Sequence, residues 1–349
     1  MSQIALYRKY RPSKFSDVVG QDSIVNVLKV AVKEKNPVHA YLFSGSRGTG
    51  KTSVARILAR ELGVSNNDMI EIDAASTRGI DDIRELRDAV RINPFDSAYK
   101  VYIIDEVHML TKEAFNALLK TLEEPPKHVI FILATTELDK LPETVVSRCQ
   151  TFSFKKPSEE ILKRIVLDVA KKEGISLEPS GAELIALLGD GSFRDTLGIL
   201  QKVAGFSRDK KISREEIEAI TGAPSDTLVN DFITAIISKN AELGMKTIGR
   251  AVERDIDMKV YLKLILYKFR LLLLIKYAPL VGGKAAEELP ESDREFIEKS
   301  MKNYSQRITS IILRELLQSY TDIGRSFIPE LPLELALIKL TTDDQQPTK

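Results

Sequence analysis

A glycine-rich segment that ends in a lysine and a threonine is the part of the sequence best suited to chemistry. It reads Gly45-Ser46-Arg47-Gly48-Thr49-Gly50-Lys51-Thr52, a full match to the Gly-x-x-x-x-Gly-Lys-Thr pattern of phosphate-binding loops. Glycines allow such a loop to turn its backbone N–H groups toward a phosphate chain, and the lysine can reach the outer phosphates. These eight residues and Ser53 are therefore the predicted phosphate-binding set, with Lys51 also expected to assist catalysis.

Two consecutive carboxylates, about fifty residues further on, complete this chemistry. The run Val101-Tyr-Ile-Ile-Asp105-Glu106 is an apolar strand pattern that ends in two acids. Asp105 and the Thr52 hydroxyl are suited to holding magnesium, and Glu106 can polarise the water that attacks a terminal phosphate. Alone, such a run is usually a buried strand that meets solvent. Together with the loop it favours hydrolysis of ATP with Mg²⁺ over simple nucleotide storage.

The first 156 residues alternate short β-rich runs with helical patterns, which predicts a parallel sheet with crossover helices. The expected strands are Ala40 to Ser44, Met69 to Asp73, Val101 to Asp105, Val129 to Thr135 and Thr151 to Phe154. The loop and the two acids then fall at strand ends, and a helix over Ser53 to Glu61 is expected after the loop. A glycine-rich turn without a ligand is disfavoured because strand and helix flank it as the motif requires.

Beyond Pro157 the strand pattern vanishes and helical patterns persist. Helices are expected over Glu159 to Glu173 and Ser180 to Leu188, and Ser213 with Glu216 forms a capping box for another. A break at residues 222–225 separates a small helical domain, 157–222, from a second helical domain, 223–341. The last residues, 342–349, are polar and are expected to be disordered.

The second helical domain contains two unusually apolar segments, Met258 to Leu280 and Ile308 to Ile323. Helices that are apolar on nearly every face are buried. A three-helix domain would struggle to cover both segments, which favours a collar-like oligomerisation domain. A self-contained helical bundle is the alternative.

Charge and composition exclude several classes of protein. The 51 Lys and Arg residues balance 50 Asp and Glu, so the net charge of +1 gives no global attraction to nucleic acid or membrane. The single cysteine, Cys149, cannot form an internal disulfide or a multi-cysteine zinc site. The N-terminus lacks the apolar stretch of a secretory signal, and basic residues interrupt the most apolar segment, Tyr261 to Val281. A cytoplasmic location and no membrane partner are expected.

Several further segments together resemble the clamp-loader branch of the AAA+ ATPases, and specifically the gamma/tau subunits of bacterial DNA polymerase III. The segments are Tyr10-Arg-Pro12, Phe15-Ser-Asp-Val-Val-Gly-Gln21, His39-Ala-Tyr-Leu-Phe-Ser-Gly45, Ile104-Asp-Glu-Val-His-Met-Leu110, Phe115-Asn-Ala-Leu-Leu-Lys-Thr-Leu-Glu-Glu-Pro-Pro126, Ser147-Arg148-Cys149 and Gly191-Ser-Phe-Arg-Asp195. The match covers about residues 6–222. It implies a P-loop AAA+ domain over 1–156, a helical lid domain over 157–222 and an all-α collar domain over 223–341.

The resemblance assigns roles to residues outside the loop. Arg148 is implied to be an arginine finger that acts in trans on a neighbouring subunit's nucleotide, where a guanidinium suits phosphate oxygens. Thr136 is implied to be the first sensor, with Thr135 as the alternative, and Arg194 the second. Residues implied to line the adenine side are Tyr7, Arg11, Pro12, Val18 and Val19. For these five, an N-terminal arm that packs on the core is the alternative.

The resemblance also implies partners. Thr77, Arg78 and Lys120 are candidates for contact with the DNA backbone, with ordinary solvated helix charges as the alternative. Gamma/tau subunits usually carry a four-cysteine zinc module after the helix that follows the loop, but Leu62 to Met69 bridges that position directly, so no zinc is expected. The implied partners are other clamp-loader subunits in a hetero-pentameric ring, the sliding clamp, primer-template DNA and single-stranded DNA-binding protein.

The function implied is an ATP-hydrolysing motor subunit that opens the sliding clamp and loads it on primer-template DNA. Another AAA+ machine, such as a branch-migration motor, is one alternative, and a nucleotide-regulated scaffold without productive turnover is another. Tau-type proteins carry further C-terminal segments, so a short, gamma-like form or a truncated chain is expected.

Overall fold

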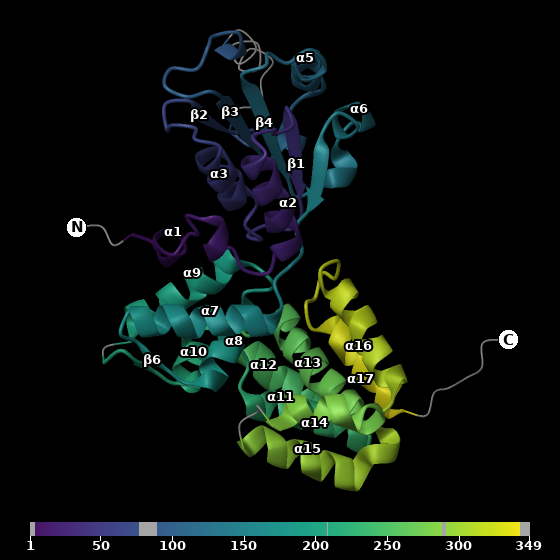
Figure 1. The fold of residues 1–349 in the computed structure, drawn as a ribbon. Helices are drawn as coiled ribbons and strands as arrows, with labels where there is room; N and C mark the ends of the chain where they lie inside the picture. Colours follow the sequence, from purple (N-terminus) through teal and green to yellow (C-terminus); the bar gives the residue numbers. More distant parts are fainter. Residues whose placement is uncertain (1–3, 77–88, 208, 288–290, 343–349) are drawn as a thin grey trace, which may run out of the picture. The chain divides into compact units, whose positions relative to one another are not determined.

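The computed structural model describes residues 4–76, 89–207, 209–287 and 291–342 (Figure 1). The chain divides into two compact units. The first unit contains Met1–Glu173 and Ile185–Gln201, and the second contains Gly174–Leu184 and Lys202–Lys349. The predicted division into three domains, with boundaries at 156 and 222, remains a prediction.

A five-stranded parallel sheet forms the centre of the first unit, with the strand order β2-β3-β4-β1-β5. The strands are β1 Ala40–Ser44, β2 Met69–Asp73, β3 Lys100–Asp105, β4 Val129–Thr135 and β5 Gln150–Ser153. Ser44 lies opposite Thr135, and Asp73 lies opposite Asp105, so the strands end at one edge. The segments that follow β1, β3 and β4 are thereby brought together at that edge.

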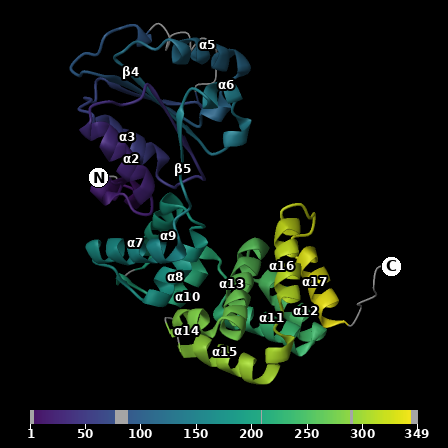
Figure 2. The same ribbon diagram turned by 45° about the vertical axis from the view of Figure 1, so that its right-hand side comes forward.

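Helices lie on both faces of the sheet (Figure 2). Alternating side chains of the strands belong to two buried clusters, one on each face. On β1, Tyr41 and Phe43 belong to the same buried cluster as residues of α2 (Asp22–Lys33) and α3 (Lys51–Glu61). Leu42 belongs to the other cluster, with residues of α5 (Lys112–Glu123). Both faces are covered, which explains why the central strands are apolar along their whole length.

Several short helices and the longer α7 complete the first unit. They are α1 Leu6–Lys9, η1 Phe15–Asp17, η2 Val107–Met109, η3 Leu138–Lys140, α6 Glu143–Val146 and α7 Glu159–Lys172. Two further helices, α8 Pro179–Leu188 and α9 Phe193–Phe206, run across the division between the units.

The parallel sheet expected from the sequence is confirmed, with three strands at their predicted bounds. The strand β3 begins one residue earlier than predicted, and β5 is shifted by one residue. The expectation that strands end after Pro157 was wrong, because β6 (Ser176–Leu177) and β7 (Lys211–Ile212) form a small parallel pair. Strands of two residues are too short to show an alternating pattern.

Apart from the β6–β7 pair, the described part of the second unit is mainly helical. Its remaining helices are α10 Arg214–Thr221, α11 Asp226–Ser238, α12 Ala241–Glu253, α13 Met258–Tyr277, α14 Pro279–Glu287, α15 Glu291–Tyr304, α16 Ser310–Ile323 and α17 Leu331–Thr341, with η4 Ser305–Arg307. The capping box of Ser213 and Glu216 on α10 is present as predicted. No helix of the described residues is long and apolar enough to span a bilayer.

One expectation for this region was wrong. The apolar segment up to Leu280 is not one helix, because α13 ends at Tyr277 and a new helix begins at Pro279. Several helices cover α13, which contacts α11, α12, α14, α15 and α16. The sequence did not single out the more polar helices α12 and α15. Because this cover comes from the same chain, the burial of α13 does not by itself require a second subunit.

An apolar stripe nevertheless stays exposed on α17. Leu331, Leu335 and Ile338 are 38%, 58% and 43% exposed, and their spacing places them on one face of the helix. On the adjacent α16, Ile311 and Leu317 are also exposed. Leu331, Leu335 and Ile338 form the α17 stripe.

A buried carboxylate organises the link between α3 and β2. The side chain of Asp68 is buried and accepts hydrogen bonds from the backbone N–H groups of Phe95, at 2.6 Å, and Asp96, at 2.9 Å. Desolvation alone would raise the pKa of Asp68. These N–H groups and the hydroxyls of Ser97 and Ser65 outweigh it and hold the pKa at about 2. Asp68 therefore joins the turn before β2 to the turn before β3.

We expect Asp68→Asn to lower the free energy of unfolding by about 1–3 kcal/mol, because a charged acceptor of two backbone N–H groups is lost. Since the folded-state pKa is depressed, the contribution of Asp68 is present above about pH 4 and is lost as the pH falls toward 2. Denaturant unfolding of both proteins at several pH values should show a difference that shrinks across this window. The exposed Asp139→Asn is the control, and a pH-independent difference would contradict the assignment.

Candidate functional site

The loop between β1 and α3 has the backbone of a phosphate-binding loop. Gly45, Gly48 and Gly50 have φ angles of 142°, 74° and 102°, a region that side chains rarely adopt. Gly50 is the N-cap of α3, so the first N–H groups of that helix open into the loop. Space also demands glycine here: a Cβ on Gly45 would lie 2.4 Å from the Phe154 carbonyl oxygen.

Lys51 lies inside this loop. Its Nζ donates to the carbonyl oxygens of Gly45, at 2.7 Å, and Ser46, at 3.0 Å, and the residue is 5% exposed. Burial lowers the pKa of Lys51, while the carboxylates of Glu106 and Asp105 oppose this shift. A buried cation and the N–H groups at the start of α3 therefore lie in one loop, which suits a polyanionic ligand.

Thr52 and Asp105 meet across the edge of the sheet. The Thr52 hydroxyl donates to Asp105 Oδ2 at 2.7 Å, and the Glu106 N–H donates to Asp105 Oδ1 at 3.0 Å. A hydroxyl and a carboxylate that converge in this way are the hard oxygen ligands that Mg²⁺ prefers. The predicted pair thus fits a magnesium ion.

Glu106 is held in a strained conformation beside this pair. Its φ of 48° lies in the left-handed region, which is uncommon for glutamate. Thr136 stabilises it: the hydroxyl and N–H of Thr136 donate to Glu106 Oε2 at 3.0 and 3.2 Å. Thr135 is buried and instead bonds with His108 at 3.0 Å. Of the two sensor alternatives, the geometry favours Thr136.

The start of α9 contacts the loop directly. The Phe193 N–H donates to the Gly48 carbonyl at 3.0 Å, and a Cβ on Gly48 would lie 1.9 Å from Ser192 Oγ. The next residue, Arg194, places its guanidinium over the Tyr7 ring at 5.0 Å. The second predicted sensor is therefore next to the loop and stacks on a residue of the predicted adenine side.

The other residues predicted to line the adenine side differ in their surroundings. Arg11 Nε donates to Ser53 Oγ at 2.9 Å, which joins the N-terminal arm to the first turn of α3. Burial lowers the pKa of Arg11. Val18 packs on the core of the sheet, as the alternative interpretation required, and Pro12 and Val19 are half-buried.

Arg148 is not part of this cluster. Its guanidinium donates to the Thr144 carbonyl and to Glu123 Oε1, both at 2.7 Å, on α6 and α5. The Arg148 side chain is 35% exposed, so it remains accessible at the surface. This placement is compatible with an action outside its own chain.

The residues predicted to bind DNA are only partly described. Lys120 is exposed on α5, whereas Thr77 and Arg78 lie outside the described residues, as does the tail 343–349.

Sequence reasoning missed His108. It is one of three histidines in the chain, the others being His39 and His128. The described residues include no group of three His, Cys, Asp or Glu side chains that could hold a metal. Yet His108 is buried and touches Thr135, Glu106 and Glu137. Its position three residues after Asp105 was the available signal.

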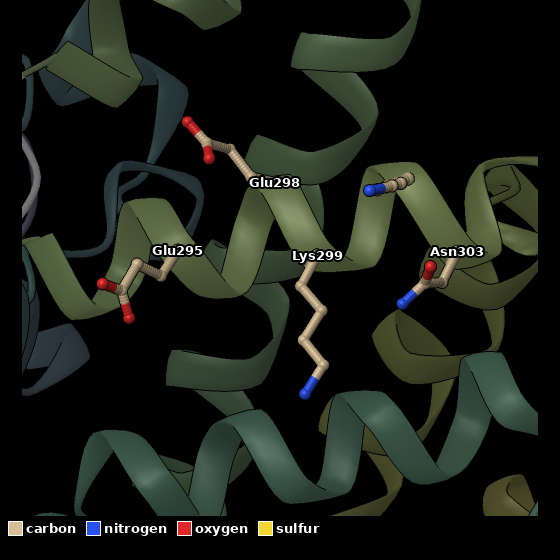
Figure 3. Close-up of a pocket in the computed structure, with 5 residues that line it drawn as sticks. Glu295, Glu298, Lys299 and Asn303 are labelled. Atoms are coloured by element: carbon tan, nitrogen blue, oxygen red, sulfur yellow. The ribbon is translucent and has the colours of Figure 1, made fainter.

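Two other features are separate from the site. Burial raises the pKa of the Cys149 thiol to about 11, which suits a packed side chain rather than a nucleophile. Figure 3 shows a depression on α15 in the second unit, where Glu295, Glu298, Lys299 and Asn303 project from a single helix. Its mixed charges and single-helix lining give it no catalytic constellation.

The fold and loop define a P-loop NTPase of the AAA+ class, followed by helical domains. Solved structures of Thermotoga maritima RuvB share this fold. The RuvB Holliday junction branch migration motor aligns with a TM-score of 0.53 and 20% identity, over 65% of this chain and 79% of that one. A single-residue variant of the same RuvB protein aligns equally well.

Comparisons of sequence are more specific. DNA polymerase III subunit tau of Bacillus subtilis is 38% identical over 99% of this chain and 64% of its own length. The Escherichia coli subunit tau is 36% identical over 95% of this chain and 53% of its own length. The gamma/tau subunit of Mycoplasma pneumoniae is 44% identical over 61% of this chain and 34% of its own.

Family models agree with these relatives. The model of DNA polymerase III subunits gamma and tau domain III matches residues 212–349, and that of the DNA polymerase III delta subunit matches 64–158. A model of magnesium chelatase subunit ChlI matches 14–104. The chain belongs to the DNA polymerase III gamma/tau family. It spans between half and two thirds of the length of the two tau relatives.

Proposed function

We propose that this chain is the ATP-hydrolysing motor subunit of a bacterial DNA polymerase III clamp loader. In this role it opens the sliding clamp and loads it on primer-template DNA during replication. The observation that carries the proposal is the convergence of Lys51, the Thr52–Asp105 pair and the Thr136–Glu106 pair at one sheet edge. A cytoplasmic location is part of the proposal.

The loop binds the nucleotide through charge and backbone. Its N–H groups and the N-terminus of α3 face the phosphates, and Lys51 exchanges its carbonyl partners for phosphate oxygens. Thr52 and Asp105 hold Mg²⁺, which neutralises charge on the outer phosphates when bound.

Glu106 acts as the base for the attacking water. A carboxylate can orient water and accept its proton, and the two hydrogen bonds from Thr136 fix which oxygen faces the nucleotide. Arg194 reports the nucleotide to the lid, because the Phe193–Gly48 hydrogen bond joins the start of α9 to the loop. Binding and lid position are coupled through this contact.

The site is completed between subunits. Arg148 would enter the site of a neighbouring copy or companion subunit. There its guanidinium N–H groups would stabilise the negative charge that develops on the phosphate oxygens in the transition state. The α17 stripe supports a collar in the helical domain 223–341, since exposed apolar side chains on one helix face suit association. A hetero-pentameric ring is the assembly proposed, with single-stranded DNA-binding protein as a further partner.

Contact of α5 with the DNA backbone gives a measurable prediction. We expect Lys120→Ala to weaken binding of primed DNA by the assembled ring uniformly across sequences, and to reduce the slope of log K against log salt by about 1. Titrations of labelled primed duplex at several salt concentrations measure both quantities. Lys246→Ala, an exposed lysine of α12, should change neither. An unchanged slope for Lys120→Ala would mean that Lys120 makes no contact with the DNA backbone and is an ordinary solvated charge.

The experiment that tests the proposed function measures ATP turnover by the assembled ring with and without clamp and primed DNA. Stimulation by both together, with the clamp left on DNA, is expected. Translocation along branched DNA without a clamp would favour a branch-migration motor. ATP binding without turnover under every condition would favour a scaffold.

A further inference from the structure

A buried histidine links the proposed base to the segment after β4. His108 lies on η2, and its side chain is 7% exposed. Its Nδ1 is 3.0 Å from Thr135 Oγ1 and 3.5 Å from Glu106 Oε2. Its Nε2 is 3.2 Å from Glu137 Oε2. The ring therefore lies between two carboxylates, one of which belongs to the proposed catalytic machinery.

The partners define how the ring is oriented. Lys140 bonds Glu137 Oε2 at 2.7 Å, and the pKa of Glu137 is lowered, first by this hydrogen bond and less by the nearby charges of Lys140 and His108. An ionised carboxylate only accepts, so the ring donates to Glu137 from Nε2 and to Glu106 from Nδ1 at the same time only when both ring nitrogens carry a proton. The contact with Glu137 fixes the ring plane, and Nδ1 then faces Thr135 and Glu106.

The same network connects the two residues that contact Glu106. Thr135 Oγ1 accepts from the Glu137 N–H at 3.0 Å and also lies next to His108 Nδ1. Thr136, which lies between Thr135 and Glu137 in sequence, donates two hydrogen bonds to Glu106 Oε2. A displacement of residues 135–137 would therefore change two contacts of Glu106, the hydrogen bonds from Thr136 and the contact with the His108 ring.

We propose that His108 is a positioning residue that, anchored by Glu137, holds the Glu106 carboxylate in place for ATP hydrolysis. This inference rests on the proposed ATPase function and adds a residue to it. The strained φ of Glu106 makes such support necessary, because a left-handed glutamate persists only where its surroundings hold it. The alternative is a buried histidine that merely satisfies Thr135 and stabilises the fold.

Two substitutions distinguish the role of His108 Nδ1 from that of Nε2. An asparagine amide can reach the place of Nδ1, and a glutamine amide can reach the place of Nε2. We expect His108→Ala to lower kcat about tenfold with KM for ATP changed less than twofold. His108→Asn should recover most of kcat, and His108→Gln should recover less, because the contact with Glu106 is made from Nδ1.

The assay is steady-state ATP turnover by the ring reconstituted with its companion subunits, clamp and primed DNA, together with equilibrium ATP binding by each variant. His128→Ala is the matched control, because His128 bonds the Val90 carbonyl before β4 begins and should leave kcat unchanged.

Equal kcat for His108→Ala and the wild type would overturn the inference alone. Equal recovery by Asn and Gln, or a loss that follows thermal stability, would assign His108 to folding. Absence of turnover in the wild-type ring would instead overturn the proposed function and the inference with it.

Discussion

Glu106→Gln should stop ATP hydrolysis while ATP affinity stays within about twofold of the wild type. The amide still accepts a hydrogen bond from Thr136, so the position of the side chain is retained. It cannot accept a proton from water, and loss of a general base costs roughly 10²- to 10⁴-fold in rate. Equilibrium binding of ATP and single-turnover hydrolysis in the assembled ring measure the two quantities.

The control for this substitution is Glu113→Gln, which removes the same charge from an exposed position on α5. Its turnover should match the wild type. If Glu106→Gln retained normal hydrolysis, the base would have to be another residue. If it lost ATP affinity instead, Glu106 would belong to the binding of nucleotide rather than to its hydrolysis.

Arg148→Ala should leave ATP binding nearly intact and lower ring-dependent turnover by on the order of a thousandfold, the effect of removing a trans arginine. Binding is preserved because the residues of the phosphate loop come from the same chain. The salt bridge to Glu123 is lost as well, but its two side chains are 35% and 49% exposed, and pairs of this kind contribute little to stability.

Two companion substitutions identify the cause of that loss. Glu123→Gln breaks the same salt bridge but keeps the guanidinium, so turnover should be close to normal. Arg148→Lys keeps the charge without the bidentate fork and should recover little. A strong defect in Glu123→Gln, or full activity in Arg148→Lys, would contradict a finger role for Arg148.

Much of the first unit follows from the sequence because its signals are local. The strands β1, β2 and β4 were predicted at their bounds, since both faces of the sheet are covered and each strand reads as a continuous apolar or alternating run. The phosphate loop has fixed spacing, and the pairing of Thr52 with Asp105 follows once both lie at one sheet edge.

The sequence was less informative where structure depends on distant contacts. The cover of α13 comes from several helices of the second unit, some too polar to be recognised as its neighbours. The choice of Thr136 over Thr135 depended on which side chain points toward Glu106 at the end of β4. The contact between His108 and Glu137 joins η2 to the residue before η3, 29 positions further along the chain, and no periodicity in the sequence could reveal it.

Complementation between two inactive variants tests the central claim, that one site is built from two subunits. Rings are assembled from a mixture of the Lys51→Ala chain, which lacks the phosphate-binding cation, and the Arg148→Ala chain. An interface that pairs an intact Lys51 with an intact neighbouring Arg148 should recover turnover that neither variant has alone. If mixed rings form but remain inactive, or if a monomeric chain hydrolyses ATP at the full rate, then Arg148 is an ordinary surface arginine and the account of a shared site is wrong.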